Sequence, residues 1–302
     1  MSIRPVRSIS RAKPTMEGAG VKLHRAFGFG NTSEFDPFLL LDDFRNDEPD
    51  AYTAGFPWHP HRGIETITYV LAGSVDHKDS LGNNGNLGAG DIQWMTAGSG
   101  ILHQEMPRGD AKGRMHGFQL WANLPSSLKM TAPRYQDIKA GEVSEVVDDD
   151  GTRVRVVCGE FWGKRGPVEG VAASPQYLDV WVPPGLRKSL PVETERHAFA
   201  YVFEGAGSFR SASKPFGVLT EKEVDGREYV VREQTGNRSL VLFDSGDEVT
   251  VQAGDEGIRF LLVSGKPLKE PVAWYGPIVM NTDAELRQAA SELRAGTFIK
   301  SN

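Results

Sequence analysis

Short runs of β-forming residues, separated by turn residues, recur along almost the whole chain of 302 residues. Clear examples are ETITYVLAGSV, GDIQWMTAG, GFQLWANL, YLDVWVPPG, AFAYVFEGAGSF and RFLLVSG. These runs are rich in Val, Ile, Thr, Phe and Tyr, and turn signals such as Asn84-Gly85 lie between them, in a chain with 34 glycines. The pattern predicts an all-β protein made of sandwiches or barrels.

The length and the course of polarity along the chain predict two domains. A chain of this size can form two domains that each bury a core. The segment APRYQDIKAGEVSEVVDDDGTRVRVV is polar and charged, and it separates two β-rich halves. We therefore predict one β-domain over residues 1–140 and a second over residues 141–302, with the boundary placed to within several residues.

Helices are expected to be few and short, and the best candidate is NTDAELRQAASELRAG near the C-terminus. Thr282 and Glu285 have the spacing of a capping box. Leu286, Ala290 and Leu293 share one face, and Gly296 supplies a stop. We expect this helix to have a structural role, closing the fold, and no part in the chemistry.

Composition excludes several classes of function. The sequence has no apolar stretch of about 18 residues and no secretory signal pattern, so we expect a cytoplasmic protein that does not span a membrane. The Arg- and Ser-rich start, MSIRPVRSISRAKP, is interpreted as a first strand or arm rather than a targeting segment. The single cysteine, Cys158, excludes an internal disulfide framework and a thiolate cluster. The net charge of -6 argues against a nucleic-acid surface.

The stretch WHPHRGIETITYV contains the first candidate site residues, His59 and His61. In a helix, residues two apart point to nearly opposite sides, and Pro60 would interrupt the helix. In a strand, residues two apart lie on one face, and a proline is tolerated near a sheet edge. Both imidazoles are therefore predicted to project from one face of an edge strand.

A second pair with the same spacing, His103 and Glu105, occurs in GSGILHQEMP. Two strands that each offer a pair of ligands can meet across a barrel interior. Three imidazoles and one carboxylate suit iron, manganese, cobalt, nickel, copper or zinc and leave positions open for substrate or oxygen. Single histidines are more often structural, and four others are read that way: His24, His77, His116 and His197.

The segment from His59 to Pro107, together with DPFLLLDDF upstream and HGFQLWANLP downstream, resembles the pirin family within the cupin superfamily of small β-barrels. The resemblance implies a protein of two cupin barrels. It places the metal ligands on His59, His61, His103 and Glu105 of the N-terminal barrel, and it implies iron as the usual metal. It also implies a C-terminal barrel without metal, and His197 there has no second histidine two residues away.

A different glutamate competes with Glu105 as the fourth ligand. Many cupins other than pirins use a glutamate four residues after the second histidine, which is Glu65 here. Glu65 has the same strand parity as His61, although a straight strand would carry it about 13 Å away. The resemblance favours Glu105, and parity alone leaves both open.

Some pirins resemble quercetin 2,3-dioxygenases, which open the central ring of a flavonol with O2 and release carbon monoxide. That resemblance implies a small aromatic substrate and gives Glu105 the catalytic role of taking the proton of the substrate 3-hydroxyl. An apolar wall for a flat ligand could come from Phe56, Trp58, Trp94 and Met95. His116 and Gln119 could orient a ligand imidazole.

Two other readings belong to different classes. Some pirins are metal-containing regulatory proteins that bind a transcription factor or a metabolic enzyme without turnover. No compact run of Lys and Arg marks nuclear import here. The metal site could also be a vestige on a structural protein, although the intact set of four ligands makes this reading the least attractive.

Overall fold

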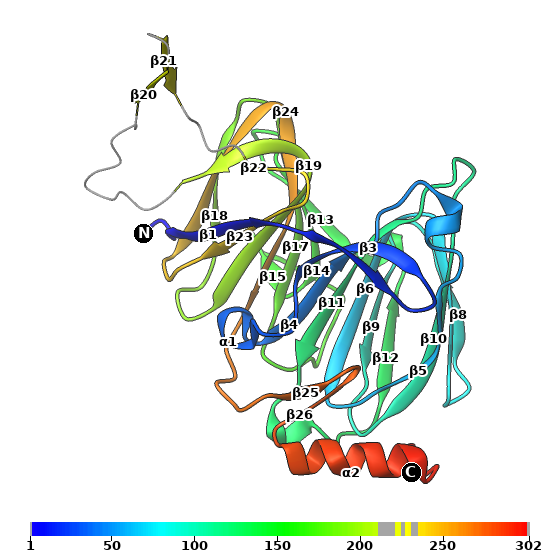
Figure 1. The fold of residues 1–302 in the computed structure, drawn as a ribbon. Coiled ribbons are helices and arrows are strands. Elements are labelled where there is room, and N and C mark those ends of the chain that lie inside the picture. The colour runs from blue at the N-terminus through cyan, green and yellow to red at the C-terminus, as the bar shows by residue number, and fades with distance from the viewer. Residues whose placement is uncertain (1, 211–220, 225–226, 231–234, 301–302) are drawn as a thin grey trace.

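The computed structural model describes residues 2–210, 221–224, 227–230 and 235–300, and strands dominate it (Figure 1). The described residues contain two α-helices, α1 (Thr32–Phe35) and α2 (Asp283–Arg294). Three short 3-10 turns, η1 to η3, cover Pro49–Ala51, Ser126–Leu128 and Ala140–Glu142. The prediction of an all-β protein with few short helices is confirmed.

The first barrel is built from two sheets. The larger sheet has the order β12 (Arg134–Ile138), β9 (Ile92–Thr96), β6 (Ile64–Ala72), β11 (His116–Asn123), β4 (Phe38–Asp43), β3 (Val21–Phe27) and β2 (Lys13–Glu17). The smaller sheet has the order β5 (Phe56–His61), β10 (Ile101–Arg108), β7 (Ser74–Asp79) and β8 (Asn84–Leu87). A cavity lies between these sheets.

The second barrel is formed mainly by one long, bent sheet. Its main path runs β1 (Val6–Arg11), β23 (Ser239–Phe243), β19 (His197–Phe209), β24 (Glu248–Gly265), β17 (Gln176–Val182), β14 (Arg153–Cys158) and β13 (Ser144–Val147). Off this path, β18 (Arg187–Pro191) pairs with β24 and β22 (Thr235–Gly236) pairs with β19. Three small hairpins complete the set: β15 (Glu160–Phe161) with β16 (Lys164–Arg165), β20 (Glu221–Val224) with β21 (Arg227–Val230), and β25 (Ala273–Tyr275) with β26 (Ile278–Met280).

The two barrels share an apolar layer where their large sheets face each other. Alternating residues of β6 and β11, such as Ile67 and Phe118, pack with Phe199 and Leu261 of the second barrel. Buried polar pairs cross the same layer, because the Tyr201 hydroxyl donates to Asp43 at 2.8 Å and the Tyr69 hydroxyl donates to Asp179 at 2.8 Å. Alternation along each strand therefore supplies a barrel interior on one face and this shared layer on the other.

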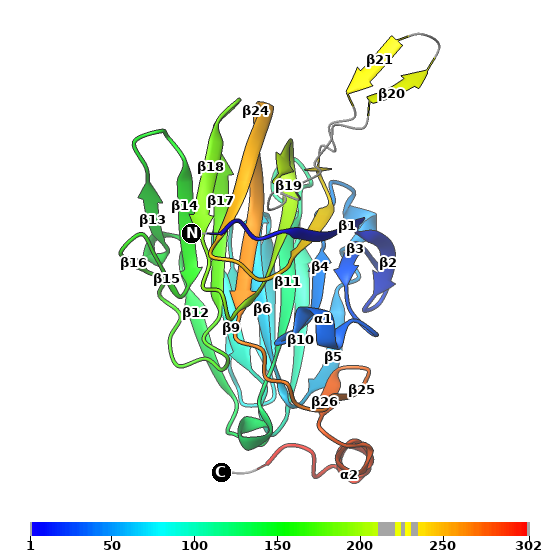
Figure 2. The ribbon, with the colours of Figure 1, turned by 90° about the vertical axis from the view of Figure 1, so that its left-hand side faces the viewer.

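The two ends of the chain cross between the barrels (Figures 1 and 2). Strand β1 comes first in the sequence but pairs with β23 of the second barrel. The β25–β26 hairpin and α2 come last but lie beneath the first barrel. The sheets change between β12, which ends at Ile138, and β13, which begins at Ser144, and we keep the division near residue 140 as a proposal.

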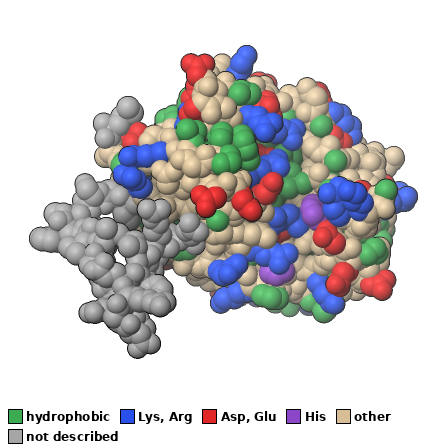
Figure 3. Space-filling view, turned by 90° about the horizontal axis from the view of Figure 1, so that it is seen from above, with side chains coloured by type: hydrophobic (Ala, Val, Ile, Leu, Met, Phe, Trp, Pro, Cys, Tyr) green, Lys and Arg blue, Asp and Glu red, His purple; other side chains and the backbone are tan. Residues whose placement is uncertain are grey.

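Helix α2 has the predicted start and stop. Thr282 and Glu285 form the capping box, and Gly296 follows the last turn with a φ of +71°. Of the residues on the face with Leu286 and Ala290, Leu293 is 38% exposed, and the fully buried residue of the helix is Ala289. No helix in the described part of the chain is long and apolar enough to cross a membrane. Seen from above, Lys and Arg side chains are interspersed with Asp and Glu (Figure 3).

Candidate metal centre

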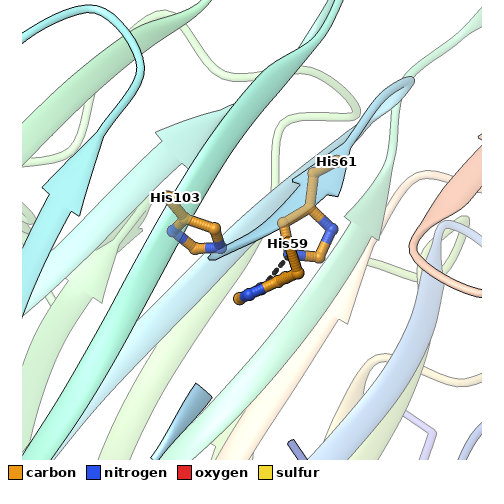
Figure 4. Close-up of side chains that lie close together, drawn as sticks. All are labelled: His59, His61 and His103. Atoms are coloured by element: carbon orange, nitrogen blue, oxygen red, sulfur yellow. Dashed lines mark hydrogen bonds between the residues drawn. The ribbon is translucent and has the colours of Figure 1, made fainter. Parts of the chain in front are cut away.

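Three histidines from two strands converge inside the first barrel. His59 and His61 project from β5, and His103 projects from β10 (Figure 4). One ring nitrogen from each lies within 4.8 Å of those from the other two. The prediction that His59 and His61 share one face of a strand is confirmed, and β5 is an edge strand that accommodates Pro60.

The strands that carry these histidines are neighbours and do not face each other across the barrel. His103 lies directly opposite His59 in the antiparallel ladder between β10 and β5. Directly opposite residues project to the same side, so the pairing itself brings the rings together. The expectation that the two pairs meet across the barrel interior was therefore wrong. The register between two neighbouring strands of one sheet brings the histidines together instead.

Hydrogen bonds on the far side of two rings fix which nitrogen is free. His59 Nδ1 lies 2.9 Å from the Pro57 carbonyl oxygen, and His61 Nδ1 lies 3.1 Å from the Pro277 carbonyl oxygen. A carbonyl oxygen only accepts, so each Nδ1 must carry the hydrogen and donate it. In the neutral rings, both Nε2 atoms then carry lone pairs, and these two atoms lie 3.1 Å apart.

Two lone pairs at this distance repel each other unless a cation lies between or beside them. Two nitrogens about 2.1 Å from one metal ion, at right angles to each other, are about 3.0 Å apart. The spacing of 3.1 Å therefore fits two ligands of one ion. His103 adds a third donor, since neither of its ring nitrogens has a hydrogen-bond partner among the described residues. The residues present fit a divalent metal.

Burial keeps these imidazoles neutral, as metal ligands must be. Desolvation lowers the pKa of His61 and His103 well below the usual value, and neighbouring imidazoles lower each pKa further. Desolvation also lowers the pKa of His59. The site is therefore a set of neutral nitrogen donors.

Glu105 lies on β10 and lines the same cavity, but its carboxylate is not part of the tight group formed by the three histidines. The Thr68 hydroxyl lies 3.2 Å from its Oε1 and can donate a hydrogen bond to it. Burial raises the pKa of Glu105 to about 7, and the Thr68 hydrogen bond opposes that rise. A carboxyl with this pKa can accept or release a proton near neutral pH.

The competing glutamate, Glu65, faces away from the histidines. Gly63, with a φ of +76°, ends the β5 segment, so strand parity does not continue from His61 into β6. Thr68 lines the cavity, and Glu65, three residues earlier in the same strand, lies on the opposite face, where it accepts a hydrogen bond from Thr96 at 2.8 Å. Glu65 is therefore excluded as a ligand of this group.

The cavity around the histidines measures about 500 Å³ and is largely lined by apolar side chains. Phe56 and Trp58 line it as expected, and Trp121 packs edge-on against His61 with ring centroids 5.1 Å apart. The expectation for Trp94 and Met95 was wrong. Trp94 is fully buried in the layer between the barrels, and Met95 packs in a separate core with Val279.

Of the two proposed orienting residues, Gln119 lines the cavity and His116 does not. His116 lies on the outer side, where its ring pairs with Asp47. Register explains the difference, because Gln119 is opposite Thr68 whereas His116 is at the far end of β11 opposite Ala72. The partner that does orient His61, the Pro277 carbonyl, lies 216 positions away and has no signal in the sequence.

The sequence did contain one signal that was overlooked. His77 and Asp79 are two residues apart on β7, opposite Glu105 and His103 respectively, and so share their face. His77 is 3% exposed, and its ring centroid lies 5.5 Å from that of His103. Reading it as an isolated structural histidine missed this neighbourhood, although the spacing matches that of the ligand pairs.

In the second barrel, His197 is the first residue of β19, and apolar side chains fill the interior. Val180, Ala200 and Phe260 are among these residues, and each is fully buried. The expectation of a C-terminal barrel without metal stays a prediction.

Two family models match the chain, one in each barrel. A family model described as Pirin matches residues 20–122, and one described as Pirin C-terminal cupin domain matches residues 177–299. The chain belongs to the pirin family. A "Pirin-like protein" of Caulobacter vibrioides is 42% identical over 299 residues, covering 99% of this chain and 100% of that protein.

Two further relatives of this pirin-family chain carry an enzyme name. A "Putative quercetin 2,3-dioxygenase" of Pseudomonas aeruginosa is 40% identical over 299 residues and 98% of each chain is covered. A solved quercetin 2,3-dioxygenase from Acinetobacter baumannii has a TM-score of 0.83 at 29% identity, covering 98% of this chain and 99% of that one. The chain therefore has the two-cupin fold of its family.

Proposed function

We propose that the first barrel holds one divalent metal through His59, His61, His103 and Glu105, and that the protein is a metal-dependent dioxygenase of the quercetin 2,3-dioxygenase type. The convergence of three neutral imidazoles on the inside of a largely apolar cavity carries this proposal. The names of the relatives from Pseudomonas and Acinetobacter support the reaction class. Fe(II) is the proposed ion, and the same donors accept Mn, Co, Ni, Cu or Zn.

In the reaction, both atoms of O2 enter the products and the central ring of the flavonol loses one carbon as carbon monoxide. The metal, when bound, supplies a Lewis acid that favours the ionised form of the substrate 3-hydroxyl. Glu105, whose carboxyl group lies in the same cavity, takes the proton of that hydroxyl. Phe56, Trp58 and Trp121 hold the flat rings and exclude water.

Metal content of the purified protein tests the site. Replacing His103 with Ala should remove stoichiometric metal, because it deletes one of the three imidazole donors while the rest of the core stays packed. His197→Ala is the matched control in the second barrel and should keep one metal per chain. A His103→Ala protein that keeps its metal would contradict the ligand assignment.

Oxygen uptake with quercetin, measured on the same samples, tests the activity. Glu105→Gln should lower the uptake rate at least about a hundredfold, since general-base catalysis contributes about that much or more. Glu65→Gln, a buried glutamate on the other face of the barrel wall, should leave the rate unchanged. One metal per chain without uptake would favour the alternative, a metal-containing regulatory protein that binds a protein partner.

A further inference from the structure

A row of polar side chains crosses the wall that the large sheet gives to the cavity. Thr68 on β6 is opposite Gln119 on β11, which is opposite Asp42 on β4, which is opposite Arg25 on β3. Directly opposite residues project to the same side of a sheet, and all four line the cavity. We call these four residues the polar row.

The polar row begins at the proposed metal centre and ends at the cavity mouth. At one end the Thr68 hydroxyl lies 3.2 Å from Glu105 Oε1 and 2.9 Å from Gln119 Oε1. At the other end Arg25 donates from Nε and Nη2 to the two oxygens of Asp42, at 2.8 and 2.7 Å. Four strands at about 4.8 Å spacing give the row a length of about 14 Å, enough for a ligand of several rings.

The charge of the outer end favours hydroxyl groups over acids. Arg25 also pairs with Glu17 at 2.9 Å, so one guanidinium is shared by two carboxylates and the trio carries a net charge of -1. The Arg25 and Asp42 side chains are only 18% and 7% exposed, so solvent screens this charge poorly. A ligand carboxylate or phosphate would be repelled here.

Asp42 has acceptor capacity left for a ligand. An ionised carboxylate offers about four lone-pair sites, and Arg25 occupies two of those on Asp42. Gln119 adds an amide that lines the cavity and whose nitrogen carries two hydrogens, so it can donate to a ligand while it pairs with Thr68. The row can therefore pair with several hydroxyl groups along one edge of a flat ligand.

We propose that the polar row selects flat aromatic ligands that carry hydroxyl groups on the rings remote from the metal, with Asp42 as the acceptor that reads the outermost ring. The inference rests on the proposed function in that it requires a hydroxyaromatic ligand in this cavity. It assigns substrate selection to residues that take no part in holding the metal.

Two probes isolate this role. Quercetin carries hydroxyl groups on its outer rings, whereas 3-hydroxyflavone keeps only the 3-hydroxyl that would meet the metal. Their dissociation constants are measured on the metal-loaded protein without oxygen, so that no turnover occurs. The wild type should bind quercetin more tightly, and Asp42→Asn should reduce the preference about tenfold by weakening a hydrogen bond to a charged group.

Matched variants separate selection from general damage. Met115→Leu, in the apolar part of the same cavity, should change both affinities by the same factor. Glu17→Gln changes only an exposed residue at the cavity mouth and makes the group of Glu17, Arg25 and Asp42 neutral. It should reduce the preference for quercetin by a smaller factor, and it tests the proposal even if Asp42→Asn does not fold. The proposal would be overturned if both variants lost affinity for quercetin and 3-hydroxyflavone by the same factor, or if the preference for quercetin stayed unchanged.

Binding and oxygen uptake together distinguish a failure of the polar row from a failure of the proposed dioxygenase. A preference that depends on Asp42 without any oxygen uptake would support the polar row and contradict the dioxygenase. Oxygen uptake at equal efficiency on both probes, with no effect of Asp42→Asn, would contradict the polar row and support the dioxygenase. Failure of both ligands to bind would overturn both.

Discussion

The Nε2 atoms of His59 and His61 lie 3.1 Å apart, while the opposite side of each ring is held by a carbonyl oxygen. Neither ring can turn away without losing its Nδ1 hydrogen bond. A bound cation would replace the repulsion between the two lone pairs with attraction to one shared charge. Metal binding should stabilise the fold as well as enable chemistry.

A thermal shift measurement checks this expectation. Mn²⁺ or Zn²⁺ at about a hundred times its dissociation constant should stabilise the metal-free wild type by about 2.7 kcal/mol, because the ion binds only the folded state. His103→Ala should lose most of this shift, whereas His197→Ala should keep it. An equal shift in all three proteins would mean that the ion binds elsewhere.

For single residues, the sequence predicted correctly those positions that depend only on alternation along one strand. His59 and His61 share a face because only Pro60 separates them, and parity needs no knowledge of neighbours. Trp94 and His116 were misplaced because their faces depend on register against other strands. The parity argument for Glu65 failed at Gly63, where a positive φ interrupts the strand.

The β25–β26 hairpin and α2 act together as a clamp on the metal-bearing strand. Lys129 Nζ donates to the Gly63 and Val279 carbonyl oxygens at 2.8 and 2.9 Å, joining the end of β5 to β26. Arg62, which is 2% exposed, pairs with Glu292 of α2 at 2.8 Å and donates to the Phe298 carbonyl oxygen. A Cβ at Gly63 would collide with the Val279 carbonyl, so the approach requires glycine.

Weakening this clamp should disturb the metal site from a distance. Glu292→Ala leaves the buried Arg62 without its carboxylate, which should cost about 3 kcal/mol of stability. Because the same segment positions the Pro277 carbonyl on His61, metal affinity should fall about tenfold. Titration of metal into the variant checks this, with Arg287→Ala on the exposed side of α2 as the control. Unchanged affinity in a destabilised Glu292→Ala protein would limit the clamp to a structural role.

The strands and helix α2 could be predicted from local sequence patterns, but the way in which they pack together could not. The capping box at Thr282 and the stop at Gly296 are local signals, and both were confirmed. Nothing local indicates that β1 pairs with β23 or that α2 lies beneath the other barrel, because these contacts depend on the complementary shapes of surfaces distant in sequence.

In the whole molecule, the crossed chain ends and the shared apolar layer make the barrels interdependent. Cys158 lies in this layer, is 2% exposed, and has a thiol pKa raised by burial to about 12. The folded thiol therefore keeps its proton at pH 8 and should not react with thiol reagents. Because the unfolded thiol ionises near pH 9, this group also makes stability fall as the pH rises above 9.

Cys158 thus reports whether the barrels separate before they unfold. With increasing denaturant, its reaction at pH 8 should begin at the same midpoint as the loss of β-sheet circular dichroism, in one cooperative transition. Cys158→Ser provides the blank for the reagent. Reaction of Cys158 at denaturant concentrations that leave the circular dichroism unchanged would show that the layer opens first.

The distance in sequence between His61 and the Pro277 carbonyl that orients it has a consequence for synthesis of the chain. A ribosome adds about 5 to 20 residues per second, so the 216 positions between the two residues take about 10 to 40 s to synthesise. During that interval the three histidines exist in a nascent chain, but the group that fixes His61 does not. The centre reaches its final geometry only after Pro277 has been added, which delays selective metal capture by that interval.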